Sequence, residues 1–127
     1  MKDRTKLNQL WKDAGWRGAL TILFGSPQLS SDGRVWQHVD LDREEIRFAK
    51  ILKDGTFSSG ERTLIEIAAS LFNQEATVNL WEAFNRLDER SAKLAIIAIC
   101  NFARVPSLEN SFVNREIGKF NRNNRER

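Results

Sequence analysis

Side chains suited to chemistry are concentrated between Trp36 and Glu45. His38 is the only histidine of the chain, and Asp40, Asp42 and two glutamates follow it closely. A histidine near carboxylates can act as a general base, but neither a second histidine nor an activated nucleophile accompanies this one. The acidic residues lack the regular ligand spacing and the turning glycine of a calcium loop. We therefore expect a structural histidine, with no catalytic residue, no metal site and no cofactor.

A second candidate for chemistry is the segment Ser58-Ser59-Gly60-Glu61, which resembles the LSGGE signature of ABC-type ATPases. The chain has no G-x-x-x-x-G-K-[ST] motif to cradle phosphates, and the resemblance would put Trp81 in place of the magnesium-holding aspartate. Ser58 and Glu61 also have the spacing of a helix capping box, in which each side chain bonds to the backbone amide of the other. We expect this segment to begin a helix and not to bind a nucleotide.

Hydrophobic spacing predicts a mainly α-helical protein, a compact single-domain bundle of about five helices. Leu7, Leu10 and Trp11 share one face of a first helix that Gly15 can end. The apolar run at residues 18–24 favours a helix, with a short buried strand as the alternative. Residues 25–34 are rich in Gly, Ser and Pro and are typical of a loop, and an alternating pattern near residues 34–39 predicts a short β element.

Capping residues predict the later helices. Asp42 and Glu45 have capping-box spacing, which predicts a helix that continues to Gly55. Asn79 begins another helix, and Asp88 caps the last long one. Since that last helix is apolar almost all round from residue 94 to residue 103, we expect it to be the central and most buried element. The single cysteine lies within it, so no intrachain disulfide can form.

The net charge of +3 is concentrated in one segment. Residues 115–127 carry five basic and two acidic side chains, and the other 114 residues carry fifteen of each sign. We expect residues 1–114 to form the helical domain and residues 115–127 to form a basic, flexible tail. The tail supplies the candidates for binding nucleic-acid phosphates: Arg115, Lys119, Arg122, Arg125 and Arg127. No apolar run reaches the ~20 residues of a membrane span, so we expect a cytoplasmic protein without membrane contact.

Two of the four tryptophans are the main candidates for contacts with a partner protein. Trp16 lies beside glycines and Trp36 beside a polar loop, so each is either a partly exposed anchor or a core residue, whereas Trp11 and Trp81 fit core positions. Basic residues on the polar face of the predicted 42–55 helix either are simply solvated or contact the same partner. The candidate partner-binding set is Trp16, Trp36, His38, Arg43, Arg47 and Lys50.

The order of motifs after residue 46 resembles that of small uncharacterised proteins of phages and mobile elements. The similarity covers about residues 46–103 and rests on Ser58-Ser59-Gly60-Glu61, Leu71-Phe72-Asn73, Val78-Asn79-Leu80 and Leu87-Asp88. It implies no catalytic residue and no substrate, but it favours a protein that acts on a host or phage macromolecule.

Two functions fit these observations. The first is a non-enzymatic protein-interaction module, such as a phage-encoded inhibitor that acts on a host defence protein or nucleoprotein complex in the manner of an anti-CRISPR protein. The alternative is a nucleic-acid-associated accessory protein whose basic tail binds phosphates. We favour the first because the charges of the body are balanced and no nucleic-acid-binding motif is present.

Overall fold

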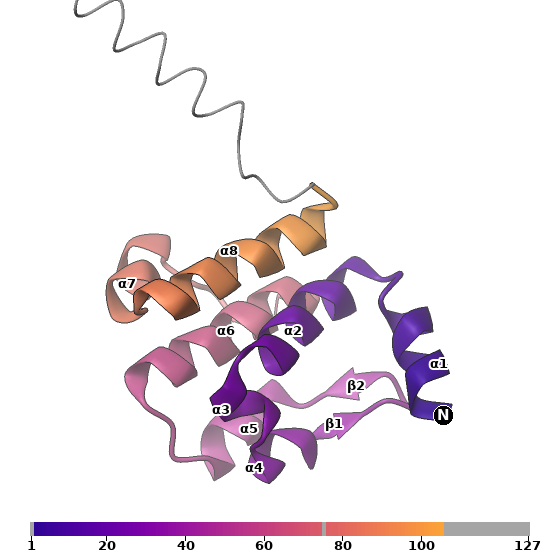
Figure 1. Cartoon of the computed structure of the whole chain (residues 1–127). Coiled ribbons are helices and arrows are strands. Elements are labelled where there is room, and N and C mark those ends of the chain that lie inside the picture. Colours follow the sequence, from indigo (N-terminus) through magenta and orange to yellow (C-terminus); the bar gives the residue numbers. More distant parts are fainter. Residues whose placement is uncertain (1, 75, 106–127) are drawn as a thin grey trace, which may run out of the picture.

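The computed structural model describes residues 2–74 and 76–105. They form eight helices and one two-stranded sheet (Figure 1). The prediction of a mainly helical single domain is confirmed, whereas the expected number of about five helices is too low. The long helices are α2 (Ala14–Gly25), α6 (Ser59–Asn73) and α8 (Glu89–Ala103). The shorter elements are α1 (Lys2–Leu10), α3 (Pro27–Ser30), α4 (Gly33–Trp36), β1 (Val39–Asp40), β2 (Glu45–Ile46), α5 (Phe48–Asp54) and α7 (Leu80–Arg86).

Helix α2 is the centre of the fold. It packs against both α6 and α8, and eight of its twelve residues are buried (Figure 1). Only Ala95 and Ala98 are buried in α8. The expectation that α8 is the central helix is therefore wrong. The apolar run at residues 18–24 is helical, as predicted, and it supplies much of the core.

The break between α1 and α2 comes before Gly15, where the first helix was expected to end. The Asp13 side chain accepts a hydrogen bond from the Trp16 backbone amide at 3.0 Å and so begins α2. Gly15 consequently lies in the first turn of α2 instead of ending α1. A side chain at this position would collide with the backbone carbonyl of Phe72 on α6, so glycine allows the two helices to approach closely.

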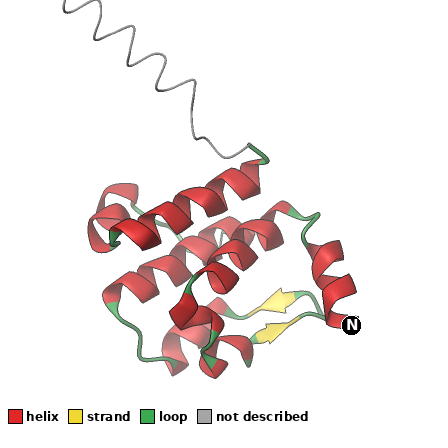
Figure 2. Cartoon of the chain, viewed as in Figure 1, coloured by secondary structure: helices red, strands yellow, loops and turns green. Residues whose placement is uncertain are grey.

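A short hairpin replaces the first part of the helix predicted from Asp42 to Gly55 (Figure 2). Val39 pairs with Ile46 across the antiparallel strands, so the β element lies a few residues later than predicted. The Asp40 carboxylate accepts a bond from the Arg43 amide at 3.0 Å. This local bond favours a turn over a helix start. Only the second part of the predicted helix is present, as α5.

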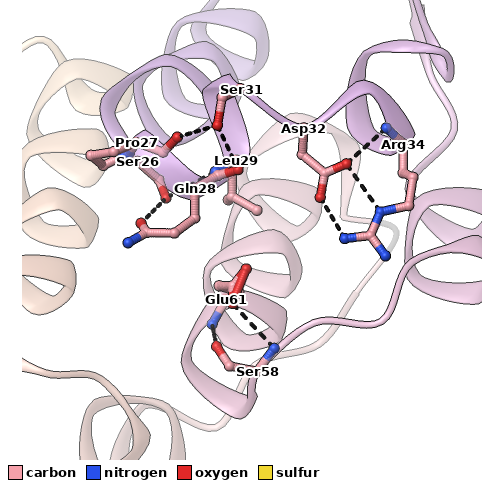
Figure 3. A network of polar contacts seen from close by, with 9 residues as sticks. All are labelled: Ser26, Pro27, Gln28, Leu29, Ser31, Asp32, Arg34, Ser58 and Glu61. Atoms are coloured by element: carbon pink, nitrogen blue, oxygen red, sulfur yellow. Dashed lines mark hydrogen bonds and ion pairs between the residues drawn. The ribbon is translucent and has the colours of Figure 1, made fainter.

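The predicted caps of the three later helices are confirmed. Ser58 and Glu61 form a complete capping box, with bonds of 3.2 and 3.3 Å (Figure 3). Asn79 caps α7 by accepting from the Glu82 amide at 3.1 Å, and Asp88 caps α8. The Glu61 carboxylate therefore accepts the hydrogen bond that the backbone amide of Ser58 donates. These bonds give the Ser58-Ser59-Gly60-Glu61 segment a structural role.

The close-up in Figure 3 also shows how the predicted loop at residues 25–34 folds into one-turn helices. Ser26 caps α3, and Asp32 caps α4 while pairing with the Arg34 guanidinium at 2.7 Å. The hydrogen bonds from Arg34 hold the pKa of the Asp32 carboxyl below its ordinary value of 3.8. Short polar side chains thus order a segment whose composition is typical of loops.

Candidate functional site

The outer face of α8 carries the largest group of exposed apolar side chains in the described part of the chain. Ile96 is 50% exposed and Ile99 is 38% exposed. They lie between Ala92 and Ala103 with spacings of four, three and four residues, which puts all four on one face of the helix. This is the spacing of a seam between two packed helices. We call Ala92, Ile96, Ile99 and Ala103 the α8 seam.

The buried face of α8 lies next to the α8 seam. Ala95 and Ala98 are fully buried there, where α8 meets α2. On α2, a side chain at Gly18 would contact Phe102, and one at Gly25 would collide with Leu94. Small residues on both helices therefore allow close backbone approach, and the bulkier isoleucines are left on the solvent side.

Charged residues of α8 lie next to the α8 seam. Glu89 and Lys93 form an ion pair of 3.4 Å, and both side chains are exposed. On the side toward α3, Arg90 and Lys93 line an open groove of about 600 Å³ whose apolar wall includes Leu94 and Ile97. An apolar centre with a polar border is the usual arrangement of a protein–protein interface.

Helix α7 carries a second exposed apolar site. Trp81 is 78% exposed, the largest exposed fraction among the bulky apolar residues of the described part. It directly follows the first residue of α7, and it is not on the face that buries Ala83. The expectation that Trp81 lies in the core is therefore wrong. Trp11, also expected in the core, is 41% exposed.

The tryptophans proposed as exposed anchors have other surroundings. Trp16 is only 5% exposed and contacts Phe72 edge-on, with ring centroids 5.1 Å apart. It belongs to the core and cannot contact a partner in this fold, which corrects the prediction. Trp36 is half-buried: its indole N–H donates to the Ser30 carbonyl at 2.9 Å, and its ring lies against Phe24.

The remaining predicted partner-binding residues do not join Trp16 in one surface. His38 lies 2.7 Å from the Asp54 carboxylate and so connects the segment before β1 with the end of α5. Arg43 and Arg47 belong to the hairpin region, where each lies 3.9 Å from a neighbouring carboxylate. Lys50 is exposed on α5. The predicted stripe of basic residues on one helix is therefore wrong, because the helix begins only at Phe48.

The predicted nucleic-acid-binding residues, Arg115, Lys119, Arg122, Arg125 and Arg127, lie outside the described residues, as does the predicted boundary at residue 114. Within residues 2–74 and 76–105, no three His, Cys, Asp or Glu side chains gather as metal ligands, and no helix is long and apolar enough to cross a bilayer.

One further feature was missed at the level of sequence: a lone arginine, Arg17, stands in an apolar run between Gly15 and Gly18. Its side chain is buried, and within the described residues it bonds to four backbone carbonyls, which include that of Phe102 near the end of α8. A single charge inside an apolar segment is the signal that could have singled it out.

Comparison with protein families, with curated proteins and with solved structures finds no match to this chain.

Proposed function

We propose that this chain is a non-enzymatic protein-interaction module that binds an amphipathic helix of a partner protein along the α8 seam. The observation that carries the proposal is the outward orientation of Ile96 and Ile99 on a well-capped helix. These apolar side chains are exposed to water and have the spacing of a helix-packing face. Covering them with a second helix lowers the free energy by about 25 cal/mol per Å² of buried apolar area.

The seam has the shape that helix packing requires. Two large side chains stand in its middle and two alanines at its ends, so a partner helix can insert its own bulky residues beside the alanines. The exposed charges of Glu89 and Lys93 at the start of α8 can form polar contacts at the border of such an interface. The partner is therefore a protein with an exposed apolar helix face.

The resemblance of residues 46–103 to phage and mobile-element proteins supports a host or phage complex as the source of the partner. In this proposal the chain acts as an inhibitor or accessory factor that occupies a helix-binding surface of a host defence or nucleoprotein complex. All of α6, α7 and α8 lies within the region of resemblance.

The test compares capture of partners by three full-length proteins: the wild type, a double variant Ile96→Lys with Ile99→Lys, and the control Leu80→Lys. Leu80 is 64% exposed on α7 and lies outside the seam, so the control introduces the same type of side chain at another exposed apolar site. After photo-crosslinking in an extract of the native host, we expect one crosslinked protein that the control retains and the double variant loses.

Two results would contradict the proposal. One is a set of captured proteins that is the same for all three proteins. The other is sedimentation of the wild type as a dimer that the seam double variant disrupts, with no crosslinked protein that depends on the seam. In that case a second copy of this chain occupies the seam.

A further inference from the structure

A different surface lies where the turn after α1 meets the end of α8. Arg17 connects the two: its guanidinium donates to the carbonyls of Trp11 at 3.0 Å and Lys12 at 3.2 Å on one side. On the other side it donates to the carbonyls of Asn101 and, at 3.0 Å, Phe102. These bonds hold the α1–α2 turn against the last turn of α8, two regions more than eighty residues apart in the sequence.

Positive charges converge at this contact. Arg104 also donates to the Lys12 carbonyl at 3.2 Å, so two guanidinium groups bond to the same oxygen atom. In the described part of the chain, Lys12, Arg17 and Arg104 have no ion-pair partner. The carbonyls at the end of α8 compensate part of the Arg17 charge. Mutual repulsion of the remaining charges is a cost that a bound anion would relieve.

Along the whole sequence, basic residues are also concentrated toward the two ends that meet at this contact. Residues 1–17 carry five basic and two acidic side chains, and residues 104–127 carry six basic and three acidic ones. Between them, residues 18–103 carry nine basic and twelve acidic ones. Both ends are thus basic and the middle is acidic. Arg17 and Arg104 bring the inner limits of the two basic ends together, where the α1–α2 turn meets the last turn of α8.

An aromatic ring lies at the same edge. Trp11 is 41% exposed and, with Lys12, Arg104, Cys100 and Val105, lines an open groove of about 460 Å³ that has no acidic residue among its lining. Proteins that bind single-stranded nucleic acid combine cations for the phosphates with exposed aromatic rings on which bases stack. A duplex offers no unstacked base to such a ring.

We propose that this surface, the basic junction formed by Trp11, Lys12, Arg17 and Arg104, binds single-stranded nucleic acid. Lys12 and Arg104 contact phosphates, a base stacks on Trp11, and Arg17 holds the two halves of the junction together. The junction is separate from the α8 seam, so this inference does not depend on the proposed partner protein.

The test uses the full chain and a fluorescein-labelled oligothymidylate of twelve nucleotides, with binding followed by fluorescence anisotropy between 50 and 300 mM salt. At 0.1 M salt we expect Lys12→Gln and Arg104→Gln each to weaken binding about fivefold, and the double variant to lower the salt slope by about 1.4, since each phosphate contact on a single strand contributes about 0.7. Trp11→Ala is expected to weaken binding roughly fivefold or more, through loss of stacking. Lys50→Gln and Lys53→Gln on α5 are matched controls that should bind as the wild type does.

Three further probes distinguish the source of the anion. Heparin should bind with the same dependence on Lys12 but without dependence on Trp11, since it has no bases. A duplex of the same length and vesicles with anionic lipid should bind more weakly than the single strand. Equal or tighter binding of duplex or vesicles, or unchanged binding by the Lys12 variant, would overturn the proposal. The Lys12 side chain makes no hydrogen bond in the described part, so this variant leaves the fold intact and keeps the test decisive if Arg104→Gln unfolds.

Discussion

Helices α2 and α8 have similar apolar content but opposite surroundings. In α2 eight of twelve residues are buried, whereas in α8 only two of fifteen are, and both are alanines. The difference arises because α2 packs extensively against both α6 and α8, whereas α8 packs extensively against α2 alone and makes a smaller contact with α6. Apolar composition alone therefore does not say which helix forms the core; the placement of small residues on the helix surface decides which face can approach a neighbour.

The contact between the two helices is also polar at one end. Asn101 of α8 donates to the Thr21 hydroxyl at 3.0 Å, and the Thr21 hydroxyl donates in turn to the Arg17 carbonyl. Together with Arg17, these bonds fix the position of α8 along α2. Ile96 and Ile99 lie beside this contact and stay partly exposed.

The largest expected effect comes from truncating a core residue of α2 and comparing it with the same kind of change on the α8 seam. Leu23→Ala should lower the free energy of unfolding by roughly 2–5 kcal/mol, because Leu23 is completely buried and its removal leaves a cavity. Ile96→Ala should change it by less than about 1 kcal/mol, since half of the side chain is already in water. Urea denaturation measures both. Equal losses would contradict the difference between the two helices.

The next largest effect is expected for Arg17→Met, which keeps the apolar stem of the side chain and removes the guanidinium. Four backbone carbonyls at the ends of α1 and α8 then lose a buried donor, and the free energy of unfolding should fall by about 3 kcal/mol. Hydrogen exchange should accelerate first in the last turn of α8. Arg34→Met, an exposed arginine on α4, is the control and should cost much less.

Local signals in the sequence predicted the starts of α6, α7 and α8 correctly. Ser58, Asn79 and Asp88 begin helices because a side-chain oxygen that satisfies a free backbone amide acts within one turn, independently of the rest of the fold. The cap expected at Asp42 is absent because the Asp40 carboxylate forms a turn with Arg43 first. The segments at Asp42 and at Ser58 both have the spacing of a capping box. What distinguishes the Asp42 segment is that its residues join the turn and strand β2, which pairs with β1.

Exposure was harder to predict than secondary structure. The predicted exposure is wrong for two tryptophans: Trp16, expected as a surface anchor, is in the core, and Trp81, expected in the core, is exposed. Trp16 lies next to glycines because these allow α6 and α8 to pack closely on α2, and not because the segment is a surface loop. The basic junction could not be derived from spacing, since it combines residue 12 with residue 104. Only the distribution of charge along the chain indicates it.

A smaller effect is expected from Gly15→Ala, which tests the close packing of α2 on α6. The added methyl group would meet the backbone carbonyl of Phe72, which cannot move without shifting α6, so the free energy of unfolding should fall by about 1–3 kcal/mol. In Gly33→Ala the methyl group meets no atom within 4 Å. We expect that variant to be unchanged or more stable by up to about 1 kcal/mol, because alanine favours the helix. Thermal unfolding of the two variants side by side would show whether the packing on α2 is as close as the structure indicates.

The smallest expected effect concerns the start of α8 and its dependence on pH. The Ser91 backbone amide donates to the Asp88 carboxylate at 2.7 Å and lowers the pKa of that carboxyl below its ordinary value of 3.8. Because the folded protein holds the charged form more strongly, the stabilisation is fully present above the unfolded pKa and is lost as the pH falls through the lower folded pKa. Below about pH 4, amide exchange at Ser91 should therefore accelerate in the wild type more than in Asp88→Asn, whose neutral side chain still caps the helix without titrating. The α2 amides should respond equally in both proteins, since Asp13 caps that helix in each. Identical acid profiles at Ser91 would mean that the Asp88 charge does not hold the first turn of α8.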